Sequence, residues 1–194
     1  MKNILSIAYV SFASSSFLLG TAALADYEDG VEAAFAGDFD TAFQEFTIAA
    51  QEGLSLAQYN LGILYFTGQG IEQDFDEAFK WTKRAAEQGH LNAQFNLGSL
   101  YLDGQGTQVS VVEGINWFTQ AAKNGHADSA YTLAKMYQDG NFVSSDPVQA
   151  HAWAAQSEIN EHPEASLLKE EIERDLSAEE IRQARRMFAT WQIE

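Results

Sequence analysis

The stretch Ala57-Gln-Tyr-Asn-Leu-Gly-Ile-Leu-Tyr-Phe-Thr-Gly-Gln-Gly70 decides the fold, because it returns 36 residues later. Residues 93–106 read Ala-Gln-Phe-Asn-Leu-Gly-Ser-Leu-Tyr-Leu-Asp-Gly-Gln-Gly. Aligned without gaps, Asp38–Gln73 and Asp74–Val109 are identical at 18 of 36 positions. Such self-similarity at a fixed period indicates an array of stacked structural units.

Each unit contains two helical patterns. In the first, apolar residues such as Ala78, Trp81 and Ala85 recur at spacings of three and four, which predicts an amphipathic helix. Four residues spaced by 36 are suited to accept hydrogen bonds at the start of this helix: Asp38, Asp74, Ser110 and Asp146. Tryptophan recurs at residues 81, 117 and 153, and we expect Trp117 to be buried between units.

The second helix of a unit runs over about Leu56–Phe66, and Asn92 and Asp128 are the expected caps in later copies. Glycines at residues 68, 104 and 140 lie where a left-handed residue would end it. Gly62 and Gly98 lie inside this helix, where each costs about 1 kcal/mol relative to alanine. Their repetition predicts a close approach between helices as compensation.

The periodicity ends on both sides of the array. Tyr27–Ala36 is predicted to be a short helix ahead of it, and two charged helices follow it, at about Glu164–Arg174 and Ala178–Trp191. A stacked array needs ends with a polar outer face, and these segments suit that role.

Met1–Ala25 has the features of a cleavable secretory signal peptide. Lys2 gives a positive start, an uncharged segment follows, and Ala23-Leu24-Ala25 supplies the small residues that a signal peptidase requires. An uncleaved membrane anchor is the alternative, since about 20 apolar residues can span a bilayer. Six serines and threonines in this segment favour cleavage. We therefore predict a bacterial periplasmic or secreted protein with no stable membrane span after cleavage.

The predicted organisation has no linker and no second domain. Its segments are the signal peptide (1–25), an N-terminal capping helix pair (26–53), repeat 1 (54–89), repeat 2 (90–125), a degenerate repeat 3 (126–160) and C-terminal capping helices (161–194).

Composition excludes several classes of function. The chain has no cysteine, which rules out disulfide scaffolds and thiolate metal sites. Its 11 basic and 28 acidic residues give a net charge of −17, which argues against binding to nucleic acid. The acidic surplus has two interpretations, solubility or attraction to a basic partner surface.

The sequence lacks the usual signatures of catalysis and metal binding. It contains no H-E-x-x-H, G-x-S-x-G or S-x-x-K motif. His90 and His126 occupy the same repeat position and are interpreted as turn residues, His162 as a loop residue, and His151 as a partly buried one. We predict no catalytic residue, no cofactor and no metal.

At the repeated residues the chain resembles the Sel-1-like repeat family, a branch of the tetratricopeptide superfamily. The resemblance rests on Ala57–Gly70 with Asp74–Gly89 and on Ala93–Gly106 with Ser110–Gly125, and it weakens in the third copy. It implies an all-α fold, a right-handed α-solenoid of antiparallel helix pairs with a concave groove. Members of the family generally act as adaptors or scaffolds.

The resemblance also implies which residues face the groove. They are Tyr59, Asn60, Ile63, Phe66, Phe95, Asn96, Ser99, Leu102, Tyr131, Lys135 and Gln138. Such aromatic and amide side chains suit an extended peptide or a helix of an envelope protein. For Tyr59, Phe95 and Tyr131 packing between repeats is an equal alternative. The residues at 63, 99 and 135 differ between copies, which favours a role in specificity.

The predicted function is therefore a non-enzymatic protein–protein interaction adaptor or regulator. The alternative is an envelope hydrolase acting on peptidoglycan or β-lactams, by analogy with cysteine-rich relatives whose cysteines this chain lacks.

Overall fold

The computed structural model describes residues 22–193, and every regular element in that range is a helix. The first helix covers residues 22–36, so it contains the predicted Tyr27–Ala36 helix and four further residues of the predicted signal peptide. The rest of that peptide, residues 1–21, lies outside the described residues. No helix within 22–193 combines the length and the apolar composition needed to cross a bilayer.

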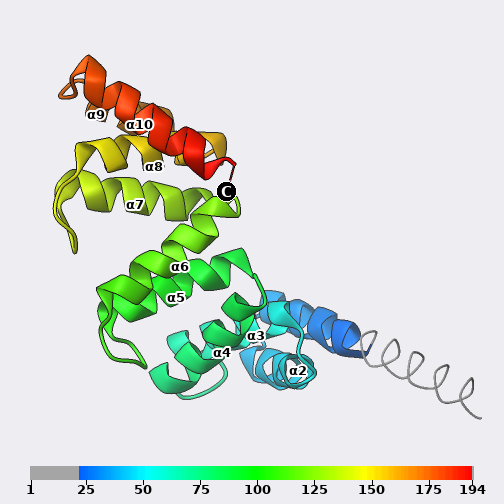
Figure 1. Cartoon of the computed structure of the whole chain (residues 1–194). Helices are drawn as coiled ribbons and strands as arrows, with labels where there is room; N and C mark the ends of the chain where they lie inside the picture. Colours follow the sequence, from blue (N-terminus) through cyan, green and yellow to red (C-terminus); the bar gives the residue numbers. More distant parts are fainter. Residues whose placement is uncertain (1–21, 194) are drawn as a thin grey trace, which may run out of the picture. The chain divides into compact units, whose positions relative to one another are not determined.

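The chain divides into two compact units, one ending at His90 and one beginning at Leu91. After the N-terminal helix, the first unit contains α2 (Phe39–Gln51), α3 (Ser55–Thr67) and α4 (Phe75–Glu87) (Figure 1). The second unit contains α5 (Leu91–Asp103), α6 (Val111–Lys123), α7 (Ala127–Asp139), α8 (Pro147–Ile159), α9 (Ala165–Glu173) and α10 (Ala178–Trp191). The division falls at the start of the second predicted repeat, where the sequence gives no sign of a linker.

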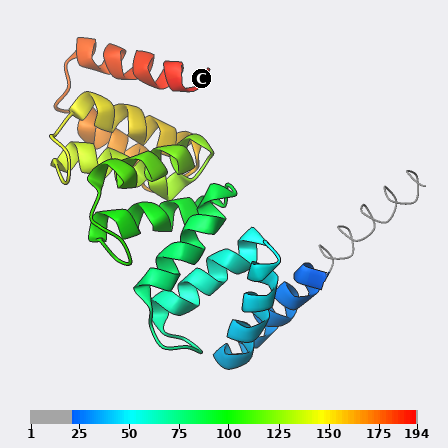
Figure 2. The ribbon, with the colours of Figure 1, turned by 60° about the horizontal axis from the view of Figure 1, so that its bottom comes forward.

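The core of the first unit lies where successive helices pack on one another, α2 on α3 and α3 on α4. Phe46, Leu61 and Trp81 are buried there. The N-terminal helix, blue in Figure 2, adds Tyr27 and Val31 to this core, and the ring centroids of Tyr27 and Phe46 are 5.8 Å apart. The helix ahead of the repeats is therefore a packed part of the first unit.

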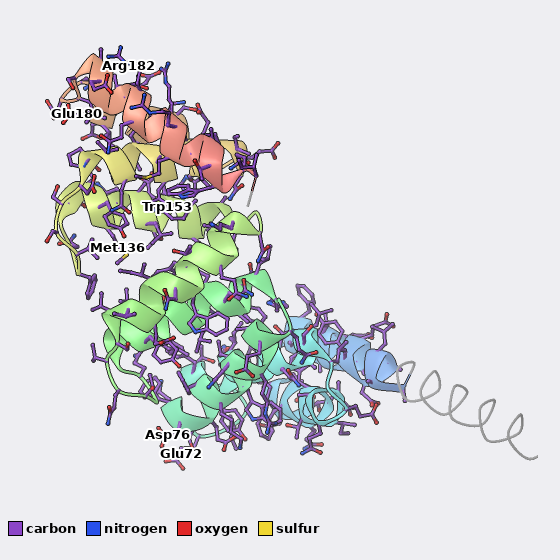
Figure 3. The ribbon with its side chains drawn as sticks, viewed as in Figure 1. Glu72, Asp76, Met136, Trp153, Glu180 and Arg182 are labelled. Atoms are coloured by element: carbon purple, nitrogen blue, oxygen red, sulfur yellow. The ribbon has the colours of Figure 1, made fainter. Side chains whose placement is uncertain are left out.

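In the second unit, α5 packs on α6, α6 on α7, α7 on α8, and α8 on both α9 and α10. Phe118, Leu133 and Trp153 are buried in its core. Trp191 from α10 stacks on Trp153 with ring centroids 4.1 Å apart (Figure 3 labels Trp153). The two predicted C-terminal helices are present, and α10 has the predicted bounds.

The repeated capping residues act as predicted. Asp38, Asp74, Ser110 and Asp146 each accept a hydrogen bond from a backbone N–H in the first turn of α2, α4, α6 and α8. The C-terminal ends of the second helices α3 and α7 are capped by Gly68 and Gly140, whose φ angles are 71° and 72°.

The glycines inside the second helix of each repeat mark close helix contacts, as predicted. A Cβ atom on Gly62 would lie 2.7 Å from the Thr82 Oγ1 atom, and one on Gly98 would lie 2.8 Å from a ring carbon of Phe118. A side chain at either position would press on the neighbouring helix. The close packing that glycine allows therefore compensates for its low helix propensity.

The predicted caps Asn92 and Asp128 are wrong, because both residues lie within the first turns of α5 and α7. At α7 the cap is His126, whose Nδ1 atom accepts a hydrogen bond from the Ser129 N–H at 3.1 Å. A neutral imidazole nitrogen can act as such an acceptor. Histidine is not among the residues preferred at helix N-caps, so these preferences favoured Asp128, two residues after the true cap.

The expectation that Trp117 is buried is also wrong, because its side chain is only half-buried. Phe118, 1% exposed, occupies the core instead and fills the space beside Gly98. In the other copies Trp81 and Trp153 are buried as expected. Adjacent helix residues point about 100° apart, so with Phe118 directed into the core Trp117 is turned partly away from it.

Candidate functional site

The residues predicted to face a groove all lie on α3, α5 and α7, the second helix of each repeat. Within each helix most of them are spaced by three and four residues, which places them on one face, and Asn60 and Asn96 lie directly beside Tyr59 and Phe95. None of the eleven side chains is fully buried. Phe66 is the most accessible of them, with 38% of its surface exposed, and the other ten are half-buried. In each unit, the helix face that these residues form is therefore accessible to a binding partner.

Three of these residues are also engaged in a repeated stack with histidine. The rings of Tyr59 and His90 are 4.4 Å apart in the first unit. In the second unit Phe95 stacks on His126 at 5.2 Å, and Tyr131 stacks on a third histidine at 4.1 Å. Such offset stacks add to the stability that comes from area burial. Stacking on a histidine is therefore a structural contact that these three rings make, whatever else they contact.

The third histidine of this series is His162, which the sequence reasoning treated as a loop residue. It lies 36 residues after His126, as His126 lies 36 residues after His90, so the repeat period itself carried the signal. Its ring is nearly parallel to that of Tyr131, with an angle of 13° between them. The hydroxyl of Tyr131 also donates a hydrogen bond to Glu164 at 2.9 Å.

Burial in these stacks affects the titration of the rings. Burial lowers the pKa of His90, and it lowers the pKa of His126 against a smaller opposing effect of the Asp128 charge. Burial, and then the hydrogen bond to Glu164, raises the pKa of Tyr131. The two histidines are therefore held in the neutral form near pH 7, in which one ring nitrogen is available as an acceptor.

The first unit contains a surface hollow of about 400 Å³. It is lined by three groups of side chains: Tyr27, Val31, Ala34 and Phe35 from the N-terminal helix, Phe39 and Phe46 from α2, and Asn60, Ile63, Leu64 and Gln69 from α3 and the residues after it. Two of the predicted groove residues, Asn60 and Ile63, belong to this lining. The structure thus brings them together with residues from two other helices.

The N-terminal helix contributes to this hollow, which was not predicted from the sequence. Tyr27, Val31, Ala34 and Phe35 recur at the three- and four-residue spacing of one helix face. That spacing could have shown an apolar face, but not which helix it meets. Phe35 remains 90% exposed, so the apolar face is only partly covered within the first unit.

In the second unit two other predicted groove residues contact each other. Lys135 Nζ donates a hydrogen bond to the Gln138 side chain at 2.9 Å and forms an ion pair with Asp139 at 3.2 Å. Ser99 forms only a long hydrogen bond to the backbone oxygen of Phe95, at 3.4 Å. At the equivalent position of the first repeat the hollow has Ile63. This repeat position therefore has an apolar side chain in the first repeat (Ile63), a hydroxyl in the second (Ser99) and a charged one in the third (Lys135).

His151 is buried more deeply than predicted, with 2% of its surface exposed. Its Nε2 atom lies 2.6 Å from a carboxylate oxygen of Glu173, which joins α8 to α9. This hydrogen bond lowers the pKa of Glu173. Within residues 22–193 no group of three histidine or acidic side chains is arranged to hold a metal ion. His151 thus has a structural partner in the packing of the two helices.

The acidic helix α9 is only partly neutralised by the arginines of α10. Arg185 reaches Glu173 at 3.9 Å, whereas Arg182 and Arg186 pair with Glu179 at the start of their own helix. One carboxylate of α9 is therefore paired with an arginine of α10, and the other two arginines form ion pairs within α10.

Comparisons with solved structures place these helix pairs among known folds. A protective antigen of uropathogenic Escherichia coli strains, described as displaying an SLR fold, is 31% identical, with a TM-score of 0.68 over 78% of this chain and 32% of that protein. A Sel1 repeat protein from Oxalobacter formigenes is 35% identical, with a TM-score of 0.61 over 67% of this chain and 54% of that protein. This chain thus spans about a third and about half of the two proteins. No curated protein sequence matches it significantly.

The comparison with protein families identifies the repeat. The model described as "Sel1 repeat" matches three segments, residues 55–90, 91–126 and 127–157, which together make up just over half of the chain. Their boundaries lie within a few residues of those predicted from the sequence. The fold is accordingly the all-helical repeat fold that the resemblance implies. This chain belongs to the Sel1 repeat family.

Proposed function

We propose that this protein is a non-enzymatic scaffold that holds a protein partner in the bacterial periplasm or outside the cell. Sel1 repeats form protein-interaction scaffolds, and this chain has three of them. The single observation that carries the proposal is the open hollow of the first unit, where Asn60 and Ile63 lie among apolar side chains from three helices. Concave apolar surfaces with a few polar groups are typical of recognition sites.

The test of binding uses the purified protein and a matched pair of variants. Ile63→Glu places a charge in the hollow, whereas Leu167→Glu places one on α9, where the leucine is 64% exposed. Envelope proteins captured by the wild type would be identified, and the binding of each would be titrated to saturation. We expect Ile63→Glu to weaken binding at least tenfold and Leu167→Glu to leave it unchanged. Equal binding by all three proteins would refute the use of this hollow.

The location is tested separately. Cleavage after Ala25 would give an exported chain that begins at Asp26, which N-terminal sequencing and mass measurement detect directly. A product that retains residues 1–25, in the cell or in the membrane fraction, would refute the proposed location while leaving the proposed binding role open to its own test.

The envelope-hydrolase alternative gains no support from the one short histidine–carboxylate contact described above. His151 and Glu173 are paired within the packing of α8 against α9, and the imidazole is almost wholly buried. A general base has to reach a proton on its substrate, and this ring has no such access.

A further inference from the structure

The hollow of the first unit has the size and the lining of a site for a few apolar side chains. Its volume of about 400 Å³ lies at the lower end of the range for ligand pockets, roughly 300–1,000 Å³. That is too small for a folded domain and large enough for two or three apolar side chains of a peptide segment. Phe35, 90% exposed, extends the apolar surface beyond the hollow itself.

Two amide side chains give this apolar surface a means of holding a peptide backbone. Asn60 on α3 and Gln69 just after that helix both line the hollow. A primary amide can donate to a carbonyl and accept from an N–H at the same time. An extended or helical segment could therefore place apolar side chains among the aliphatic ones and keep its polar groups paired at the edge.

The charge around the hollow is of one sign. Residues 22–79 contain 12 acidic side chains and no lysine, arginine or histidine. The acidic residues are Asp26, Glu28, Asp29, Glu32, Asp38, Asp40, Glu45, Glu52, Glu72, Asp74, Asp76 and Glu77. The rest of the first unit, residues 80–90, adds Lys80, Lys83, Arg84 and Glu87, so residues 22–90 contain 13 acidic and three basic side chains, against 15 and seven in residues 91–194. The N-terminal helix, α2 and α3, which line the hollow, therefore lie in a stretch whose charged side chains are all acidic.

Several of these carboxylates lie next to lining residues in the chain. Glu28 follows Tyr27, Glu32 follows Val31, and Asp38 and Asp40 flank Phe39. All four are exposed. None of the four is among the residues that line the hollow, so each places an exposed charge next to a lining residue in the chain and outside the lining itself. Figure 3 labels two further acids of this unit, Glu72 in the loop before α4 and Asp76 in the first turn of α4.

We propose that this hollow docks a cationic amphipathic segment of another protein, with apolar side chains in the hollow and lysines or arginines against the bordering carboxylates. The proposal rests on the scaffold function above and adds the chemistry of the partner. A second copy of this chain carries the same net charge of −17 and would be repelled, as would an anionic lipid surface. Charge complementarity of this kind raises the association rate and selects among partners.

The test uses three fluorescein-labelled helical peptides of equal length, titrated with the purified protein and followed by anisotropy. The first has leucines at positions i, i+3, i+4 and i+7 with lysine elsewhere. The second replaces every lysine by glutamate, and the third replaces every leucine by serine. We expect saturable binding of the first peptide, at least tenfold weaker binding of the other two, and a loss of affinity for the first as salt rises. Equal binding of the first and third peptides would refute the proposal, since it would show charge attraction without use of the hollow.

Variants of the protein locate the binding. Phe35→Ala removes an exposed apolar side chain at the hollow, and Leu167→Ala is its matched control on α9. Glu28→Gln with Glu32→Gln removes two bordering charges, and Glu170→Gln with Glu171→Gln removes two exposed ones on α9. We expect both hollow variants to weaken the cationic peptide at least fivefold and both controls to change it less than twofold. Unfolding curves check that each variant is folded.

The remaining outcomes separate this inference from the proposed function. Concentration-dependent self-association that Phe35→Ala abolishes, or binding to anionic vesicles, would replace the cationic partner by another occupant. A captured envelope protein whose binding is lost in Lys135→Glu but kept in Phe35→Ala would uphold the scaffold function and overturn the proposed site. Failure of every peptide and of every capture experiment would overturn both.

Discussion

Replacing Gly70 with alanine gives a direct test of how the loop before α4 packs on α2. The residue has φ of +71°, and a Cβ atom built on it would lie 2.1 Å from the Phe39 carbonyl oxygen and 2.5 Å from the carbonyl carbon. The left-handed conformation costs a non-glycine residue about 1–2 kcal/mol. Moving backbone out of an overpacked contact costs about 1–3 kcal/mol more. The lower chain entropy of alanine in the unfolded state returns about 0.4–1 kcal/mol. We therefore expect Gly70→Ala to lower the free energy of unfolding by about 2–4 kcal/mol.

Gly37→Ala is the matched control for this substitution. Gly37 lies in the same unit with φ of +80°, and a Cβ atom there would have no neighbour within 4 Å. Only the conformational and chain-entropy effects apply, so its expected cost is about 1 kcal/mol. Urea unfolding, followed by circular dichroism and by tryptophan fluorescence, measures both variants against the wild type. A loss of stability equal to within about 0.5 kcal/mol in the two variants would show that the contact between Gly70 and Phe39 is not present.

Three further predictions concern a left-handed residue, a buried ring and a pair of partly buried histidines. Phe142 has φ of 66° where the earlier repeats have glycine, so Phe142→Gly should be about 1 kcal/mol more stable than Phe142→Ala in urea unfolding, the reverse of the order at an ordinary helical position. Phe118→Ala should cost about 3–5 kcal/mol because its ring is buried, and Trp117→Ala should cost clearly less because its ring is only partly buried; equal losses would contradict the inward placement of Phe118. Because burial lowers the pKa of His90 and His126, the folded state binds protons less readily than the unfolded one, and the stability these rings contribute should be complete above pH 6.5 and decline as the pH falls below it. Urea midpoints measured between pH 8 and pH 5.5 should show this decline, and His90→Gln together with His126→Gln should reduce its slope.

The candidate site shows where the sequence and the tertiary structure each contributed. The resemblance to the Sel-1-like repeat family implied which residues of α3 face a groove, and two of them, Asn60 and Ile63, line the hollow. It could not predict that the N-terminal helix supplies Val31 and Phe35 to the same hollow, because that helix lies outside the repeat and its partner is set by packing. The histidine stacks were within reach of the sequence, since residues 90, 126 and 162 share the 36-residue spacing.

The sequence by itself determined the helices, the caps at Asp38, Asp74, Ser110 and Asp146, and the left-handed glycines Gly68 and Gly140. These depend on hydrogen bonds within a few residues and on which face of a helix is apolar, and both are written in the order of side chains along the chain. Export and cleavage at Ala25 remain predictions from that order alone.

Only the tertiary structure decided which aromatic ring of α6 enters the core, where the chain divides into two units, and how a hollow forms beside α3. Each of these depends on how closely separate helices approach. Phe118 lies inward because Gly98, 20 residues earlier, leaves room for its ring. Such distances between elements arise from the packing of side chains that are far apart in the sequence, and a periodic pattern does not specify them.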